Sequence, residues 1–329
     1  MTLSYFFVQR SGEMKKEKSI LQLFPGSFRA YFETVAARYE DLSEIRIRTG
    51  RPTIVRRRGT EFYLTKDGTE KLAEGNFFEN AFCPEASQVD NMFSYLCQYS
   101  PYAYGEALKQ GFLTVSGGHR VGVAGQVFRT GDGIGGIRNI RFLNIRISHE
   151  IRGAAKPYVP YLYENHSGKI QSCLIISPPG MGKTTMLRDL VRLISDGDTD
   201  RNGCQVSIVD ERSEIAGCFQ GEPQNDVGIR TDVLDACPKA LGMEMMLRSM
   251  APEVIAVDEI ALAEDVETLL LLLNCGVRVL ATIHGETLEE VMGKPYLGPL
   301  FKANYFRRFL VLEAKGEARL FNEKGEVMR

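Results

Sequence analysis

The sequence lacks the spacing patterns of metal-binding and disulfide-linked proteins. Its seven cysteines are scattered, odd in number and never form a C-x-x-C pair, and no His/Cys spacing suggests zinc. Scattered single cysteines are typical of proteins in a reducing compartment, where thiols act as small core hydrophobes. We therefore expect a cytoplasmic protein without disulfide bonds or a structural metal.

Long apolar runs and an excess of positive charge are also missing. The most apolar stretch comprises residues 269–273 and 277–283, and Asn274, Gly276 and Arg278 interrupt it, so it is too short to span a bilayer. The net charge is −2, and basic and aromatic residues do not form a common stripe. We expect no nucleic-acid partner and no direct membrane insertion, and any position at a membrane would depend on partner proteins.

The chain is long enough for two domains, and its composition favours a folded core. Of its 329 residues, 44% are hydrophobic and 25% are charged, which are ordinary values for a globular protein. There is no internal repeat and no low-complexity segment. We predict a mixed α+β N-terminal domain over residues 1–152, a linker with Pro, Tyr and Gly over 153–168, and an α/β domain over 169–329.

The two parts differ in how apolar residues are distributed. In the N-terminal part, short strands are separated by glycines, and we place a hairpin turn at Gly131, Asp132 and Gly133 with Gly135 and Gly136. No helix follows this glycine-rich run, so we do not read it as a phosphate loop. The predicted elements are helices 28–39 and 85–98 and strands 44–48, 53–57, 61–64, 112–115, 121–128 and 140–147.

In the C-terminal part, near-continuous apolar strands alternate with helices, which predicts a mostly parallel sheet covered on both faces. The predicted strands are 173–176, 206–209, 254–257 and 277–283, the helices are 183–195, 238–250 and 265–273, and a closing hairpin follows at 309–313 and 318–321.

One segment carries the pattern of a phosphate-binding loop. Residues 174–185 read LIISPPGMGKTT and connect an apolar strand to an amphipathic helix, which is the context that a P-loop requires. Glycines let backbone N–H groups and the helix N-terminus face a phosphate. We expect Lys183 to bridge the β- and γ-phosphates of ATP and the Thr184 hydroxyl to bind Mg²⁺. The loop departs from G-x-x-x-x-G-K-[ST] at the first position, which is a serine. The expected nucleotide-binding residues are Ser177, Pro178, Pro179, Gly180, Met181, Gly182, Lys183, Thr184 and Thr185. The alternative is an ordinary strand–helix turn with a chance lysine.

Two pairs of acids follow later strands. Asp210 and Glu211 follow strand 206–209, and Asp258 and Glu259 follow strand 254–257. The carboxyl ends of parallel strands meet at one edge of the sheet, where ligands bind. We predict that Asp258 binds Mg²⁺ and that Glu259 activates the attacking water. Asp210 and Glu211 are supporting acids in this prediction, and Asp210 is also a candidate metal ligand. The alternative is that each pair caps the helix that follows it.

A histidine and several arginines are further catalytic candidates. His284 ends strand 277–283, so it should face the same edge and could sense the γ-phosphate or orient the water. Phosphoryl transfer also needs positive charge on the γ-phosphate, often from an arginine of another subunit. We favour Arg120 and Arg146 for this role. The other candidates are Arg212, Arg230 and Arg248.

Four runs of the sequence resemble the stage III sporulation protein AA family. They are GHRVGVAG at 118–125, NIRI at 144–147, RTDVLDACPK at 230–239 and LRSMAPEVIAVDEI at 247–260. More distantly, the chain is similar to type II and type IV secretion ATPases, in which an aspartate box, an acidic Walker B strand and a histidine box follow the P-loop. The corresponding residues here are Asp210 and Glu211, Asp258 and Glu259, and 281–284. Those ATPases usually carry Gly at the position of Asp258, and some carry a four-cysteine metal module that this chain lacks.

The resemblance implies a fold class and a function. It implies an α/β fold, with a RecA-like or AAA-type P-loop NTPase domain that has a mostly parallel sheet and follows a mixed α+β N-terminal domain. It implies an ATP- and Mg²⁺-dependent hexameric ATPase whose N-terminal domain lends arginines to the neighbouring nucleotide. It further implies a role in endospore formation, energising a channel complex between mother cell and forespore through membrane-protein partners. Two alternatives remain open: a RecA-like nucleic-acid motor, and a nucleotide-gated scaffold with little turnover.

Overall fold

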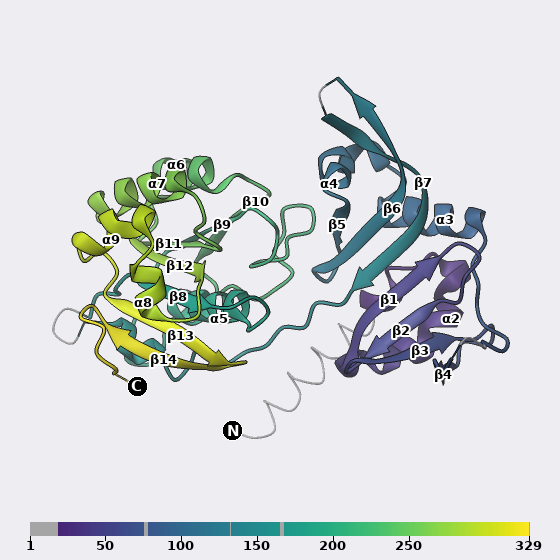
Figure 1. Ribbon diagram of the computed structural model, residues 1–329, viewed down its shortest axis with the longest axis horizontal. Coiled ribbons are helices and arrows are strands. Elements are labelled where there is room, and N and C mark those ends of the chain that lie inside the picture. Colours follow the sequence, from purple (N-terminus) through teal and green to yellow (C-terminus); the bar gives the residue numbers. More distant parts are fainter. Residues whose placement is uncertain (1–18, 76–77, 132, 165–167, 329) are drawn as a thin grey trace. The chain divides into compact units, whose positions relative to one another are not determined.

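The computed structural model describes residues 19–75, 78–131, 133–164 and 168–328, which fall into two units (Figure 1). One unit is Met1–His149 and the other is Glu150–Arg329. Each unit contains a seven-stranded sheet. The turn residue Asp132 of the predicted hairpin lies outside the described residues.

The first unit is an antiparallel sheet in the order β4-β3-β2-β1-β7-β6-β5, with helices packed on it. Buried residues of its helices and every second residue of its central strands, such as Ile45 and Ile145, form one core. Alternation of this kind leaves the opposite sheet face polar. The elements are β1 (Leu42–Arg48), β2 (Ile54–Arg57), β3 (Thr60–Leu64), β4 (Glu70–Leu72), β5 (Phe112–Val115), β6 (His119–Thr130), β7 (Gly133–Arg146), α2 (Gly26–Ala37), α3 (Ala86–Leu96), α4 (Gly105–Lys109), η1 (Tyr39–Asp41) and η2 (Pro101–Tyr104).

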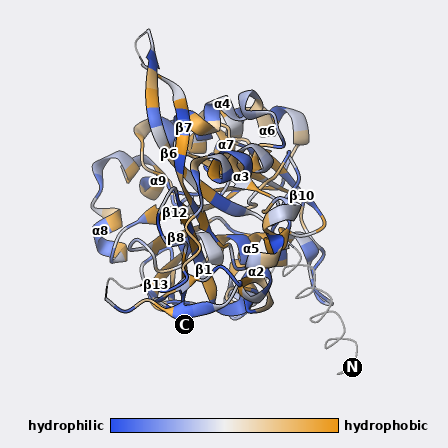
Figure 2. Ribbon diagram, turned by 90° about the vertical axis from the view of Figure 1, so that its right-hand side faces the viewer, coloured by the Kyte–Doolittle hydropathy of each residue, from blue (hydrophilic) through white to orange (hydrophobic). Residues whose placement is uncertain are grey.

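The β6–β7 hairpin is longer than the sequence analysis expected. Gly135 and Gly136, which were expected at the turn, lie inside β7 instead. Phe128 packs over them, since a Cβ atom on Gly135 would lie 2.7 Å from its ring. Glycine is therefore required here for close packing rather than for a turn. Figure 2 shows hydrophobic segments on this projecting hairpin, where Val127 and Ile134 are about half exposed.

The second unit is built on a sheet in the order β10-β9-β11-β12-β8-β13-β14. The first six of these strands run parallel, and β14 is antiparallel to β13. The elements are β8 (Cys173–Ser177), β9 (Val206–Asp210), β10 (Thr231–Asp235), β11 (Val254–Val257), β12 (Arg278–His284), β13 (Arg308–Ala314), β14 (Glu317–Asn322), α5 (Lys183–Asp196), α6 (Lys239–Met250), α7 (Ala263–Asn274), α8 (Leu288–Met292), α9 (Gly298–Lys302), η3 (Val159–Leu162) and η4 (Pro295–Leu297).

Helices cover both faces of this second sheet. On one face, α5 packs on β8, β9 and β11 to form a core, and on the other face α6, α7, α8 and α9 form a second core. Residues 153–168 were expected to be a linker, but Ala155, Val159 and Leu162 are buried in the core beneath α5. Residues 155–163 therefore pack as part of the second unit.

The sequence analysis did not predict the edge strand β10. Its sequence, TDVLD, has too few apolar residues to indicate a buried strand, and it pairs only with β9. An edge strand buries less of each side chain than a central strand, and here Asp232 is exposed while the other four residues are half-buried. Its last residue, Asp235, pairs with Asp210 at the end of β9.

Candidate functional site

A loop between β8 and α5 lies at the carboxyl edge of the second sheet. All five residues of β8 are buried, and α5 begins at Lys183 with Gly182 as its N-cap. Gly180 and Gly182 have φ values of 76° and 96°, which L side chains rarely adopt. A Cβ atom on either glycine would meet nothing within 4 Å, so the backbone conformation rather than lack of space requires glycine.

Ser177 stands where the P-loop pattern has its first glycine. It is the last residue of β8, so its extended backbone does not require glycine. Its hydroxyl is buried and donates a hydrogen bond to the carbonyl oxygen of Pro178 at 2.7 Å. The departure from the pattern therefore leaves the turn of the loop intact.

Lys183, His284 and Glu259 meet beside this loop. β12 is parallel to β8 and places His284 opposite Ser177. The Lys183 ammonium lies 2.8 Å from His284 Nε2, and the same nitrogen lies 3.3 Å from Glu259 Oε1. The ends of α5, β11 and β12 thus bring one cation, one imidazole and one carboxylate together, as the sequence analysis expected from strand ends that share an edge.

Thr184 and Asp258 form the second contact of the site. The Thr184 hydroxyl donates to Asp258 Oδ2 at 2.6 Å, and the hydroxyl of Thr282 in β12 donates to Asp258 Oδ1. Thr282 Oγ1 also accepts from the backbone N–H of Glu259 at 2.8 Å. Hydroxyl and carboxylate oxygens are ligands that Mg²⁺ accepts, with phosphate and water oxygens completing its shell. Within the described residues, no group of three or more His, Cys, Asp and Glu side chains could hold a metal by itself.

Glu259 occupies an unusual backbone position. Its φ is 60°, in the left-handed region that a residue with a side chain visits at an energetic cost. Glu259 Oε2 accepts a hydrogen bond from Arg212 at 3.0 Å. The end of β11 therefore aims the Glu259 carboxylate toward two cationic or polarisable groups, Arg212 and His284.

The Asp210 carboxylate is buried and hydrogen-bonded to backbone N–H groups. It is 2% exposed, and its carboxylate accepts hydrogen bonds from the N–H groups of Glu214, Ile215 and Ala216 at 2.8–3.0 Å. Burial raises the pKa of Asp210 to about 6, although these hydrogen bonds act in the opposite direction. Arg188 of α5 donates to the carbonyl oxygens of Glu214 and Ile215. Asp210 and Arg188 together fix the turn that follows β9.

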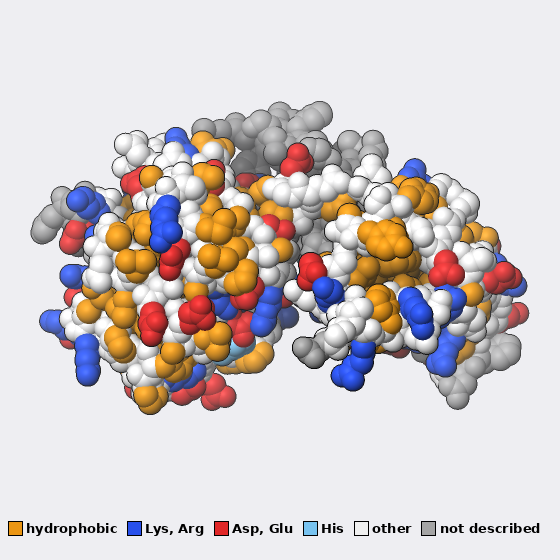
Figure 3. Space-filling view, turned by 90° about the horizontal axis from the view of Figure 1, so that it is seen from above, with side chains coloured by type: hydrophobic (Ala, Val, Ile, Leu, Met, Phe, Trp, Pro, Cys, Tyr) orange, Lys and Arg blue, Asp and Glu red, His pale blue; other side chains and the backbone are white. Residues whose placement is uncertain are grey.

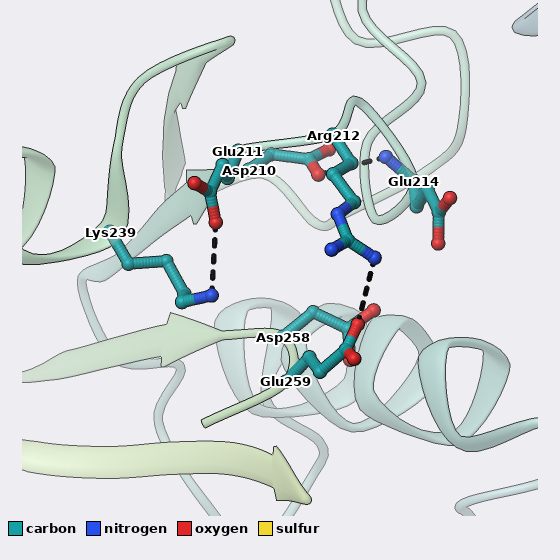
Figure 4. A pocket seen from close by; sticks show the side chains of 7 residues that line it. All are labelled: Asp210, Glu211, Arg212, Glu214, Lys239, Asp258 and Glu259. Atoms are coloured by element: carbon teal, nitrogen blue, oxygen red, sulfur yellow. Dashed lines mark hydrogen bonds and ion pairs between the residues drawn. The ribbon is translucent and has the colours of Figure 1, made fainter. Parts of the chain in front are cut away.

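Glu211 faces a small pocket with acidic and basic walls (Figure 4). In this view Lys239 extends toward Glu211, with Nζ 2.9 Å from Oε2, and Arg212 extends toward Glu259. The sequence analysis gave no role to Lys239, Thr282 or Arg188. Lys239 and Thr282 stand in segments that carried the resemblance, which was the available signal. The lining residues are Asp210, Glu211, Arg212, Glu214, Lys239, Asp258 and Glu259.

Arg120 and Arg146 lie together in the first unit. They are directly opposite each other across β6 and β7. The neighbouring residues Val121 and Ile145 point into the core, so the two arginines lie on the polar face of the sheet. The Arg120 guanidinium lies 4.0 Å from the centre of the Phe112 ring, a cation–π contact. The structure thus forms an arginine pair from two residues that are far apart in sequence.

Comparisons with known proteins extend over nearly the whole chain. The family model described as "Sporulation stage III, protein AA" matches residues 14–328. A protein of Bacillus subtilis (strain 168) named Stage III sporulation protein AA is 42% identical over 314 residues, which cover 94% of this chain and 96% of that protein.

Solved ATPase structures share the fold at low sequence identity. The Legionella pneumophila ATPase DotB superposes with a TM-score of 0.52 at 16% identity, over 88% of this chain and 77% of its own. The pilus retraction motor PilT, solved with bound ADP, gives a TM-score of 0.56 at 16% identity, over 85% of this chain and 77% of its own.

Among the described residues, no helix is both long and apolar enough to cross a membrane.

Proposed function

Because the chain belongs to the sporulation stage III, protein AA family, we propose that it is an ATPase acting in endospore formation. In this proposal, a RecA-like P-loop domain hydrolyses ATP and powers the assembly of, or transport through, a membrane-associated complex. The observation that carries the proposal is the loop of residues 177–185 with Lys183 and the Thr184–Asp258 contact at its mouth. The fold shared with DotB and PilT supports the same reading.

The second unit offers groups that could bind the phosphates and Mg²⁺. The backbone N–H groups of the loop and the N-terminus of α5 would bind the phosphates. Lys183 would exchange its contact with His284 for the β- and γ-phosphate oxygens. Thr184 and Asp258 would hold Mg²⁺, which neutralises charge on the phosphates.

Glu259 is the group that we assign to the attacking water. Its carboxylate lies 3.3 Å from His284, so the imidazole can orient it or sense the γ-phosphate. Asp210, the last residue of β9, and Glu211, which follows it, would support the site. Glu211 accepts a hydrogen bond from Lys239, and Asp210 fixes the turn that follows β9. A direct metal contact by Asp210 would have to replace its backbone hydrogen bonds.

Positive charge for the transition state would come from a neighbouring copy. Arg120 and Arg146 lie side by side on an outer sheet face of the first unit, which suits a role in trans within a hexamer. Exposed apolar side chains occur on α6 and α7, among them Leu241, Met245 and Leu271. Figure 3 shows hydrophobic side chains gathered on the face that it presents. Surfaces of this kind often form protein interfaces, so they suit contacts with other copies or with the membrane-protein partners.

Two substitutions test the enzymatic part of the proposal. Glu259→Gln should keep ATP binding and lose most phosphate release, because the amide cannot accept the proton of the water. Glu244→Gln is the matched control, since Glu244 pairs with Arg248 at 3.0 Å on the surface of α6 and does not line the pocket. Wild-type protein that binds ATP without releasing phosphate would instead favour the nucleotide-gated scaffold. Turnover that rises on addition of single- or double-stranded DNA at low salt would favour the nucleic-acid motor.

A further inference from the structure

The polar face of the first sheet collects arginines from neighbouring strands. Strands β2, β1, β7, β6 and β5 follow one another in this sheet (Figure 1). Side chains alternate between the two faces of a strand, so residues next to the buried Ile45, Val121 and Ile145 lie on the polar face. The arginines on this face are Arg46, Arg48, Arg56, Arg120 and Arg146.

Acids on the same face balance only two of these arginines. Glu44 pairs with its strand neighbour Arg46. Glu61 lies opposite Arg56 across β2 and β3 and pairs with it at 2.5 Å. The face therefore keeps an excess of positive charge, although the net charge of the whole chain is −2.

The remaining arginines lie where a sheet does not favour them. Arg146 and Arg120 are directly opposite each other on β7 and β6, and like charges in such a pair destabilise a sheet. Neither Arg146 nor Arg48 forms an ion pair with any part of the chain that the structure describes. An anionic ligand would remove the repulsion and supply the missing partners.

An amide lies between the arginines of β1 and the bare backbone of β6. Asn144 of β7 is opposite Arg46 on one side and opposite Gly122 on the other. Its Oδ1 is buried and has no hydrogen-bond partner among the described residues. Buried acceptors normally have a partner, and rotation of this side chain would present the oxygen to a donor on a ligand, such as the amino group of a base.

Two aromatic rings lie on this face as well. Phe142 of β7 is 44% exposed and lies opposite Arg48 on one side and Ala124 on the other. Phe112 of β5 lies opposite Gly122. The small residues Ala124 and Gly122 leave the sheet surface open beside both phenylalanines, so a flat group can lie against Phe142.

Positive charge, an aromatic ring and an open sheet surface suit single-stranded nucleic acid. Its phosphates pair with arginines, and its unstacked bases stack on aromatic side chains, as they do on other antiparallel sheets that bind RNA. A duplex keeps its bases stacked inside and offers none to Phe142. The linear sequence shows no basic–aromatic stripe, because these residues come from separate strands.

We propose that this sheet face binds single-stranded nucleic acid, with Arg48 and Arg146 on phosphates and a base stacked on Phe142. The inference goes beyond the proposed ATPase function and does not depend on it, because the face belongs to the first unit and the phosphate loop to the second. Arg146 cannot serve a neighbouring nucleotide and a nucleic acid at once, so the two ligands should compete for it.

The substitution Phe142→Ala tests the stacking contact. The probe is a fluorescein-labelled oligothymidylate of about 12 nucleotides, followed by fluorescence anisotropy. Loss of one stacked base should weaken binding about 5- to 150-fold. Phe142 is 44% exposed, so its truncation should leave the fold intact, which a thermal melt checks. Tyr102→Ala is the matched control, because Tyr102 is an aromatic residue of η2 that is 98% exposed and lies outside the sheet.

The substitution Arg48→Gln tests the phosphate contacts. If three or four phosphates are neutralised, raising NaCl from about 50 to 200 mM should weaken wild-type binding about 20- to 50-fold. Arg48→Gln should reduce the slope of log K against log salt by about 0.7, the contribution of one phosphate of a single strand. Lys109→Gln is the matched control and should keep the slope, because Lys109 lies on α4, whose Leu108 packs in the core on the other side of the sheet.

Several outcomes would overturn the inference. They are failure of wild type to bind the oligonucleotide at about 50 mM NaCl, equal affinity for a duplex of the same length, and equal affinity of Phe142→Ala and wild type. Loss of binding in Lys183→Ala would place the oligonucleotide on the phosphate loop instead. Phosphatidylglycerol vesicles that displace it equally well from wild type and Phe142→Ala would indicate a general anion-binding surface.

The inference and the proposed function can fail separately. A wild-type protein that binds the oligonucleotide through Phe142 but releases no phosphate from ATP would support the inference and contradict the ATPase. A protein that releases phosphate but does not bind the oligonucleotide would do the reverse.

Discussion

Thr282→Val is the substitution that most directly tests how the site is held together. Thr282 is fully buried, and its hydroxyl joins the two acids by donating to Asp258 and accepting from the backbone N–H of Glu259 at 2.8 Å. Valine has nearly the same shape, so the substitution removes both hydrogen bonds and opens little space. It also leaves the Glu259 N–H without a partner next to a backbone whose φ is 60°.

The size of the effect follows from these two hydrogen bonds. A hydrogen bond to a charged group contributes about 1.5–3 kcal/mol and a neutral one about 0.5–1.5 kcal/mol, so the free energy of unfolding should fall by about 2–4.5 kcal/mol. Glu259 should also lose its position relative to the phosphates. Misplacement by about 1 Å can cost a hundredfold in rate, so we expect kcat to fall about 10- to 100-fold. The Kd for ATP should change less than kcat, because Lys183 and the backbone of the loop of residues 177–185 are unchanged.

Urea unfolding, phosphate release and nucleotide titration measure the three quantities separately. The matched control is Thr268→Val, which removes a single buried hydroxyl of α7 that donates to the Glu264 carbonyl at 3.2 Å, outside the site. A Thr282→Val protein that loses stability but keeps its kcat would refute the positioning argument. A protein that keeps both would refute the hydrogen-bond argument as well.

The remaining predictions concern charge at the site. Lys183→Ala should abolish ATP binding or hydrolysis because the cation at the loop is lost, and unchanged turnover would overturn the site assignment. If Arg120 acts in trans, mixtures of Arg120→Ala and Lys183→Ala subunits should give non-additive ATPase activity, whereas simple dilution would contradict that role. The pKa of Asp210 is raised from 3.8 to about 6, so the folded state binds more protons than the unfolded state between these values. The contribution of Asp210 to stability is therefore present at low pH and is lost as pH rises through about 6, and Asp210→Asn should flatten this part of a pH–stability curve measured by denaturant titration.

The conformation of the loop between β8 and α5 was predictable because it depends on local sequence. Glycines that adopt positive φ, a lysine that starts a helix and an apolar strand before them all lie within residues 173–184. The same holds for most central strands and helices, whose apolar runs are long enough to indicate their type. The family resemblance could be recognised because its motifs are also short and contiguous, and the family model confirmed it.

Several details of the site depend on partners that are distant along the chain. The two oxygens of Asp210 are used by the N–H groups of residues 214–216, and no residue type in that turn indicates this. The edge strand β10 was missed because its sequence has too few apolar residues to indicate a strand, and its pairing with β9 decides its conformation. Arg120 and Arg146 become neighbours only through the register of β6 and β7.

The sequence by itself determined the position of the loop between β8 and α5, the acids that follow the strands and the family, because each is written in a few consecutive residues. Only the tertiary structure decided which groups meet: Lys183 with His284, and Thr184 with Asp258. The physical reason is that parallel pairing of β8, β12 and β11 places their carboxyl ends side by side, although Lys183 and His284 are 101 residues apart and Thr184 and Asp258 are 74 residues apart.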